Sequence, residues 1–207
     1  GSNAIRMNIK TLHIKRLCLF LALISLFLCF SCRSVPPSIP KAIMGTGRMT
    51  QEQLVSFFLM QTALAQTEEV DQEKVERLAG YYVKESAVEG INADIAFVQM
   101  CLETGFLRFG GLVTADMNNF CGLGAINAEN PGLVFPDEQT GVRAHIQHLK
   151  AYASAEPLNL PAVDPRYRYV NPKGKAPHIY NLAGTWASDP AYGHKIDQLL
   201  RRMYAGL

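Results

Sequence analysis

Apolar residues recur every three or four positions along five stretches of the chain, with polar residues between them. This spacing is typical of amphipathic helices that turn one side toward a common core. It predicts helices over residues 50–64, 71–89, 92–104, 137–154 and 192–204. Residues 156–175, in contrast, are rich in Pro and Gly and are expected to form a loop. The chain should therefore fold mainly as α-helix.

Residues at the ends of these stretches indicate where the helices begin and end. Residues 50–53, Thr-Gln-Glu-Gln, form a capping box, and Gly90 is placed to end the second helix. Either Asn92 or Asp94 is expected to cap the third helix. Residues 118–135 are rich in Gly and Asn, which predicts a small β-hairpin or irregular lobe. The predicted fold class is mainly α (α+β), a helical domain with a small β-hairpin lobe.

The N-terminal segment has the composition of an export signal. Residues 1–4 resemble an expression-tag scar, and basic residues then precede an apolar run over 17–30 that one serine breaks. A membrane span needs about 20 such residues, so this run suits a signal-peptide core. The following Ser-Cys resembles a bacterial lipoprotein signal with Cys32 as the lipidated residue, although Cys29 replaces the usual leucine. The alternative is a plain secretory signal cut nearby.

These patterns divide the chain into three parts: a tag scar and signal peptide over 1–31, a lipidated cysteine and Pro-rich spacer over 32–47, and a folded domain over 48–207. The spacer should be extended or mobile. Residues 1–31 hold four basic residues and no acid, so the remainder has 16 basic and 18 acidic residues, and nothing indicates nucleic-acid binding. We expect an exported monomer of the cell envelope, anchored to a membrane through Cys32, on a periplasmic or outer-membrane face.

Glu103 is the first candidate for chemistry, near the end of an otherwise apolar helix. Its helix carries one apolar stripe, formed by Ile95, Val98, Leu102 and Phe106. At about 100° per residue, Glu103 lies roughly 80° from that stripe and so borders the core. A carboxyl group in such a half-dry position tends to keep its proton, as a general acid must. The alternative is a partly exposed glutamate in the last helical turn.

Four segments, in order, carry a resemblance to a known family. They are Gln99 with Glu103-Thr104-Gly105, residues 119–125 (Asn-Phe-Cys-Gly-Leu-Gly-Ala), residues 141–149 and residues 186–193. Together they resemble the bacterial glucosaminidases, peptidoglycan-cleaving autolysins of glycoside hydrolase family seventy-three that are related in fold to lysozyme. The similarity runs from about residue 50 to the C-terminus. It implies a lysozyme-like glucosaminidase domain over residues 48–207.

The resemblance also implies an activity and a set of site residues. The expected reaction is hydrolysis of the β-1,4 bond after N-acetylglucosamine in peptidoglycan glycan strands, without a cofactor, with Glu103 as general acid. For the second carboxylate, Glu129 is the best-placed candidate, although it could instead be a solvated loop acid. Asp137 and Glu138 are runners-up, because they also suit the first turn of the next helix. The expected substrate-binding residues are Gln99, Asn119, Phe120, Trp186 and Tyr192.

Two other functions stay open at this stage. A lytic transglycosylase or a muramidase would act on the same glycan strand, and related folds do the transglycosylase chemistry with a single glutamate. A non-catalytic cell-wall-binding lipoprotein is the alternative from another class.

The remaining cysteines and histidines show no metal-site spacing. Cys101 and Cys121 are expected to fill small apolar positions, with a disulfide as the alternative. His145 and His148 are expected at the surface or in helix packing.

Overall fold

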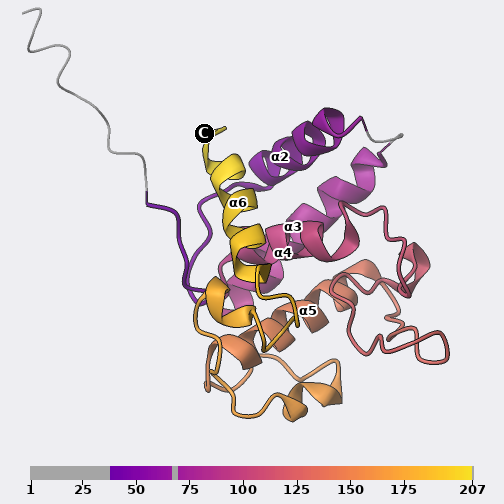
Figure 1. The fold of residues 1–207 in the computed structure, drawn as a ribbon, viewed down its shortest axis with the longest axis vertical. Helices are drawn as coiled ribbons and strands as arrows, with labels where there is room; N and C mark the ends of the chain where they lie inside the picture. Colours follow the sequence, from indigo (N-terminus) through magenta and orange to yellow (C-terminus); the bar gives the residue numbers. More distant parts are fainter. Residues whose placement is uncertain (1–37, 67–69, 207) are drawn as a thin grey trace, which may run out of the picture. The chain divides into compact units, whose positions relative to one another are not determined.

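Five α-helices make up the part of the chain that the computed structural model describes, residues 38–66 and 70–206 (Figure 1). They are α2 (Gln51–Leu64), α3 (Gln72–Glu89), α4 (Ala93–Thr104), α5 (Glu138–Ala153) and α6 (Tyr192–Tyr204). Three short 3-10 helices lie in the connections, η1 (Ala115–Met117), η2 (Pro165–Tyr169) and η3 (Ile179–Leu182). The prediction of a mainly helical domain is confirmed, with helix boundaries within two residues of those expected.

Side-chain caps explain why the helices start where the sequence predicts. Thr50 and Gln53 form a reciprocal capping box at the start of α2, and Asp71 caps α3 through the Lys74 amide. Gly90 ends α3 in the left-handed conformation, with φ of 72°. Asn92, and not Asp94, caps α4, because its side-chain oxygen accepts from the Asp94 and Ile95 backbone amides.

Helix α4 is the centre of the domain and contacts α2, α3, α5 and α6. Every residue from 93 to 101 is buried. The ring of Phe97 packs edge-on against Phe58 of α2 and Tyr82 of α3, with ring centroids 6.4 and 5.8 Å away. Each such fully buried side chain contributes about 1.5–3 kcal/mol to folding. The helix that carries Glu103 is therefore held on all sides by tightly packed neighbours.

The segment before α2 is extended and packs on the domain. Ile43 is fully buried, its amide donates to the Pro177 carbonyl over 3.0 Å, and its own carbonyl accepts from Asn92 over 2.8 Å. The compact unit accordingly begins at Ile39, earlier than the residue 48 expected from composition. Asp94 then fastens both ends of the domain to α4, since its carboxylate accepts from the Arg48 and Met49 amides and from the Tyr204 hydroxyl.

Residues 118–135 form an irregular lobe. Neither they nor any other described residues form a regular strand, and one isolated bridge, Asn127–Asn130, closes a tight turn in the lobe. The small β-hairpin is thus not confirmed. Side-chain amides replace the missing strand hydrogen bonds: Asn119 donates to the Leu123 and Leu133 carbonyls and accepts from the Leu123 amide. Such amide-to-backbone bonding lets a Gly- and Asn-rich loop keep a fixed shape.

A buried ion pair fixes the loop that follows α5. Lys150 of α5 contacts Glu89 of α3 over 2.9 Å, and both side chains are almost completely buried. The same carboxylate accepts the backbone amides of Asn159 and Leu160. With these partners the Glu89 charge is fully compensated, which a buried carboxylate requires.

The predicted signal peptide and Cys32 lie outside the described residues. Within residues 38–66 and 70–206, no helix combines the length and the hydropathy that a membrane span requires.

Candidate active site

Glu103 lies where the buried helix α4 reaches the surface. Gly105 ends the helix in the left-handed conformation, with φ of 58°, and the Phe106 amide bonds back to the Cys101 carbonyl over 2.7 Å. The buried Thr104 hydroxyl donates to the Met100 carbonyl and accepts from the Leu107 amide. These bonds fix the backbone on both sides of Glu103, whose side chain is exposed.

Two aromatic side chains donate hydrogen bonds to one oxygen of the Glu103 carboxyl group. The indole nitrogen of Trp186 lies 3.0 Å from Oε1, and the Tyr192 hydroxyl also donates to Oε1. The other oxygen, Oε2, has no hydrogen-bond partner among the described residues. Because Oε1 is already an acceptor twice, a proton on this carboxyl group is carried by Oε2, the oxygen left free for a substrate.

The environment raises the pKa of Glu103 above its ordinary value. Desolvation is the main cause, because Trp186 and Tyr192 crowd one side of the carboxyl group although the side chain is open to water on the other. The hydrogen bonds from Tyr192 and then Trp186 act in the opposite direction, since they stabilise the charged form. The net shift favours the protonated acid, in the direction expected from the position of Glu103 beside the apolar stripe.

Trp186 and Tyr192 are presented by the turn that leads into α6. The Trp186 amide bonds to the Leu182 carbonyl at the end of η3, and Tyr192 is the first residue of α6. Gly193 lets α6 approach η3 closely, because a Cβ there would lie 2.6 Å from the Tyr180 Cα atom. Any larger residue would push Tyr192 away from Glu103.

A chain of buried hydrogen bonds supports Tyr192 from behind. The Gln99 side-chain nitrogen donates to the Tyr192 hydroxyl over 3.0 Å, and the Gln99 oxygen lies 3.0 Å from His145 Nε2. His145 Nδ1 in turn lies 2.8 Å from the Tyr82 hydroxyl. Complete burial lowers the pKa of His145 to about 3, so the ring is neutral near pH 7.

Neutrality of His145 fixes the direction of every bond in this chain. The Gln99 oxygen accepts only from a protonated Nε2, so Nδ1 is the acceptor and Tyr82 the donor. The donors then run in one sense from Tyr82 through His145, Gln99 and Tyr192 to Glu103. Such a chain polarises each member toward the next and holds the Tyr192 hydroxyl on the carboxyl group.

The structure brings together four of the residues predicted for the site: Gln99, Glu103, Trp186 and Tyr192. Gln99, predicted to touch substrate, is instead fully buried beneath Tyr192. Asn119 and Phe120 are also buried, and the Asn119 side-chain amide already donates to two backbone carbonyls of the lobe. Both therefore shape the lobe from inside, and substrate contact by these two residues stays a prediction.

Among the described residues, none of the candidate acids for a second catalytic group forms a hydrogen bond with Glu103. Glu129 is exposed at the turn between Asn127 and Asn130, and in the described part of the chain it forms no hydrogen bond with the Glu103 carboxyl group. Asp137 caps α5, and Glu138 pairs with Arg77 over 3.0 Å, as expected for acids in a first helical turn. Glu129 as the second catalytic carboxylate stays a prediction.

Sequence reasoning missed the roles of Tyr82 and His145. Packing between helices was one of the two expectations for His145, and its position on the same face of α5 as Val142, Ile146 and Leu149 was the available signal. His148 is buried too, and bonds Asp164 over 3.0 Å. Nothing local in the sequence points from these histidines to Gln99 or Asp164, because the partners come from other elements.

The two domain cysteines, Cys101 and Cys121, are free and buried, and burial raises the pKa of both thiols well above its ordinary value. They fill apolar positions, as predicted. No group of three or more His, Cys, Asp or Glu residues in the described part of the chain is arranged to hold a metal ion.

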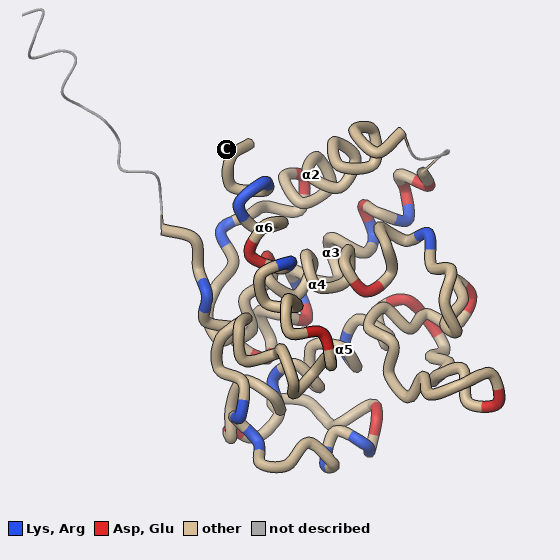
Figure 2. The backbone as a smooth tube through the Cα atoms, viewed as in Figure 1, with Lys and Arg blue, Asp and Glu red and all other residues tan. Residues whose placement is uncertain are grey.

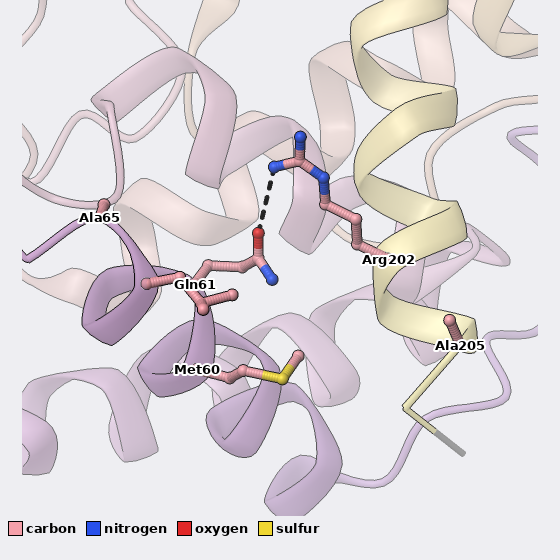
Figure 3. Close-up of a pocket in the computed structure, with 6 residues that line it drawn as sticks. Met60, Gln61, Ala65, Arg202 and Ala205 are labelled. Atoms are coloured by element: carbon pink, nitrogen blue, oxygen red, sulfur yellow. Dashed lines mark hydrogen bonds between the residues drawn. The ribbon is translucent and has the colours of Figure 1, made fainter.

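A separate hollow of about 510 Å³ lies between the C-terminal ends of α2 and α6 (Figure 3). Met60, Ala65 and Ala205 line it, and Arg202 bonds Gln61 across it over 3.3 Å. Arg202 is ten residues beyond Tyr192 on α6, which places it about 15 Å along the helix. This hollow is therefore not part of the Glu103 site.

Comparison with known proteins decides the family. The sequence model of glucosaminidase, described as mannosyl-glycoprotein endo-beta-N-acetylglucosaminidase, matches residues 79–205, which include α4, the lobe, α5 and the Trp186–Tyr192 turn. The chain belongs to the glucosaminidase family. It is a glycoside hydrolase, and its glucosaminidase domain supports endo-β-N-acetylglucosaminidase activity on peptidoglycan.

This glucosaminidase is also similar to an uncharacterized protein of Borreliella burgdorferi (strain ATCC 35210 / DSM 4680 / CIP 102532 / B31). The two are 41% identical over 158 residues, which cover 76% of this chain and 74% of that protein. No solved structure matches the chain significantly.

Proposed function

We propose that this glucosaminidase is an exported enzyme that hydrolyses the β-1,4 bond after N-acetylglucosamine in peptidoglycan, with Glu103 as the general acid. The observation that carries the proposal is that the two oxygens of the Glu103 carboxyl group differ in their hydrogen bonding. Trp186 and Tyr192 both donate to Oε1, while Oε2 has no hydrogen-bond partner among the described residues and the side chain is exposed. A general acid needs such an arrangement, with one oxygen held and the other able to deliver a proton.

In the proposed reaction, the proton on Oε2 moves to the glycosidic oxygen as the bond from that oxygen to the sugar C1 breaks. The bonding electrons stay on the leaving oxygen, and Glu103 becomes a carboxylate. Its new charge is stabilised by the same two donors, which are in place before the reaction begins. The stabilisation grows as charge develops, and this is the condition under which hydrogen bonds accelerate a reaction.

The second step requires a group that delivers water to C1. Glu129 would serve as base or nucleophile if the lobe brought it to the opposite face of the sugar. The substrate's own N-acetyl group, or a water positioned by Tyr192, would replace it otherwise. A lytic transglycosylase needs only one glutamate, and Glu103, held by Trp186 and Tyr192, would suffice for it. A transglycosylase is therefore the second candidate. Its products distinguish it.

Digestion of purified sacculi, followed by mass spectrometry of the new chain ends, tests the proposal. We expect reducing ends on N-acetylglucosamine from the wild type. Reducing ends on N-acetylmuramic acid would show a muramidase, and 1,6-anhydro ends a transglycosylase. Sacculi that bind the protein in a pull-down yet release nothing would identify the non-catalytic lipoprotein.

The matched variant for this assay is Glu103→Gln, which is nearly isosteric but has no proton to give. It should keep the wild-type melting temperature and lose on the order of 10²–10⁴-fold in turnover. Glu73→Gln is the control, because Glu73 is an exposed glutamate in the first turn of α3. Wild-type turnover by Glu103→Gln would remove Glu103 from the mechanism.

We also propose that the chain is exported as a lipoprotein anchored through Cys32. Support comes from the basic residues followed by an apolar run and Ser-Cys in residues 10–32. Cells expressing the full chain with labelled palmitate should incorporate label into the wild type and into Cys29→Ser, but not into Cys32→Ser. Labelling of Cys32→Ser, or secretion of an unlabelled wild type, would contradict the anchor.

A further inference from the structure

A second hollow, of about 280 Å³, lies beside the Glu103 site. Its lining includes Tyr152 of α5, Arg166 and Tyr169 of η2, and Lys175 in the loop that follows. Tyr152 connects it to the site, because its ring lies 5.1 Å from the Trp186 ring, whose indole nitrogen bonds Glu103. A glycan strand bound at Glu103 would therefore have neighbouring groups within reach of this hollow.

The loop around the hollow concentrates positive charge. Residues 164–175 contain four basic residues and one acid, although the chain after residue 31 has an acidic surplus of two. Figure 2 shows Lys and Arg positions along the loop that follows α5. The one acid, Asp164, is buried and already bonds His148 over 3.0 Å and the Nε of Arg166 over 3.3 Å. It leaves Lys175 uncompensated.

Two cationic groups of the hollow have unused donor capacity. The Lys175 ammonium lies 4.8 Å from the Tyr152 ring centre, and it has no carboxylate within 4.0 Å in the described part of the chain. Arg166 has a terminal nitrogen, Nη2, that is buried and lacks a hydrogen-bond partner among the described residues. Gly124 of the lobe permits this placement, because a Cβ there would overlap the guanidinium group.

An unpaired ammonium beside an aromatic ring, with a guanidinium charge in the same hollow, suits a carboxylate ligand. We propose that this hollow is a subsite for a carboxylate of the peptidoglycan substrate, with Lys175 as its ligand and the guanidinium charge of Arg166 beside it. The inference rests on the proposed function, because that function supplies a glycan strand. The carboxylate belongs either to the lactyl group of N-acetylmuramic acid, which is free only on sugars that carry no peptide, or to the peptide stem, which is joined to that lactyl group through an amide bond.

Three substrates separate the possibilities: neutral N-acetylglucosamine oligomers, glycan strands stripped of peptide, and peptide-bearing strands. For Lys175→Gln we expect KM to rise about tenfold on the strands that carry the recognised carboxylate, with kcat and the neutral oligomers unchanged. A rise on stripped strands identifies the lactyl carboxylate, and a rise confined to peptide-bearing strands identifies the stem. The effect should shrink at high salt.

Lys175→Arg should retain wild-type KM, because it keeps the charge. Arg168→Gln is the matched control, since Arg168 belongs to the same loop but does not line the hollow. An equal KM rise on all three substrates would show loss of packing on Tyr152 and overturn the subsite, as would no rise on any. An equal rise in KM for Arg168→Gln would show that the effect comes from the overall charge of the loop, and would also overturn the subsite.

Calorimetric binding of stripped and peptide-bearing fragments to the wild type and to Lys175→Gln distinguishes failure of this proposal from failure of the proposed function. An inactive wild type whose affinity still falls about tenfold on substitution keeps the subsite and loses the hydrolase mechanism. If the wild type is active and Lys175→Gln has the same affinity and KM as the wild type, the hydrolase mechanism stands and the subsite is lost.

Discussion

Removal of one hydroxyl group, by Tyr192→Phe, perturbs Glu103 without changing the shape of the site. In the wild type this hydroxyl donates to Glu103 Oε1 and so stabilises the carboxylate form. Its loss should raise the pKa of Glu103 further. Because the protonated acid is the proposed active form, the alkaline limb of the kcat profile should then move to higher pH.

The size of the shift follows from the kind of hydrogen bond that is lost. A hydrogen bond to a charged group contributes about 1.5–3 kcal/mol, and the lower value applies because Glu103 is exposed to water on one side. At about 1.4 kcal/mol per pH unit, the alkaline limb should move by about one unit. The stability of the fold should also fall by about 1–3 kcal/mol, since the buried Gln99 amide loses its acceptor.

The assay is turnover of a soluble glycan substrate between pH 4 and 9, at saturating concentration. Tyr180→Phe is the control, because Tyr180 also donates to a carboxylate, that of Asp197, but away from Glu103. It should leave the profile unchanged. An alkaline limb that stays in place in Tyr192→Phe, or moves to lower pH, would refute the assignment of Glu103 as the titrating acid.

Three further predictions concern the second acid, the buried histidine and the buried ion pair. Glu129→Gln should lower kcat by about 10²-fold or more if Glu129 is the base or nucleophile, and only a few-fold if the substrate assists. His145 is neutral in the fold and protonated in the unfolded chain below pH 6.5. The free energy of unfolding should therefore fall as pH drops from 6.5 toward 3, by up to about 1.4 kcal/mol per pH unit. Denaturation of His145→Gln should show a shallower pH dependence, and an unchanged slope would contradict this account. Lys150→Met should cost about 3–5 kcal/mol, because Glu89 stays buried without a cation, whereas the exposed Lys84→Met should cost under about 0.5 kcal/mol by the same measurement.

The helices were predictable because their signals are local. The Thr50 capping box, the Asp71 cap and the terminating Gly90 each act within four residues of their own position, and the structure confirms them. The position of Glu103 beside the apolar stripe followed from helical geometry alone. Its partners Trp186 and Tyr192 came only from resemblance, because they are more than eighty residues away in the chain.

The features that sequence could not supply depend on distant pairing of side chains. The hairpin was expected from Gly and Asn content, yet the Asn119 amide satisfies the lobe backbone where strand pairing would otherwise do so. The Gln99–His145 bond joins two helices, and neither helix carries a mark of the other. Composition placed the start of the domain at 48, whereas Ile43 is buried by contacts with residues near 91 and 177.

The docking of the extended segment has a consequence for where such an enzyme could work. With Ile39 already part of the packed domain, only six residues separate it from Cys32. Even fully stretched, the seven steps from Cys32 to Ile39 span at most about 25 Å. If Cys32 carries the proposed lipid, this short linker confines the glucosaminidase to glycan strands next to the membrane that holds it. A flexible insert before Ile39 should lengthen the linker and let the enzyme reach strands farther into the wall.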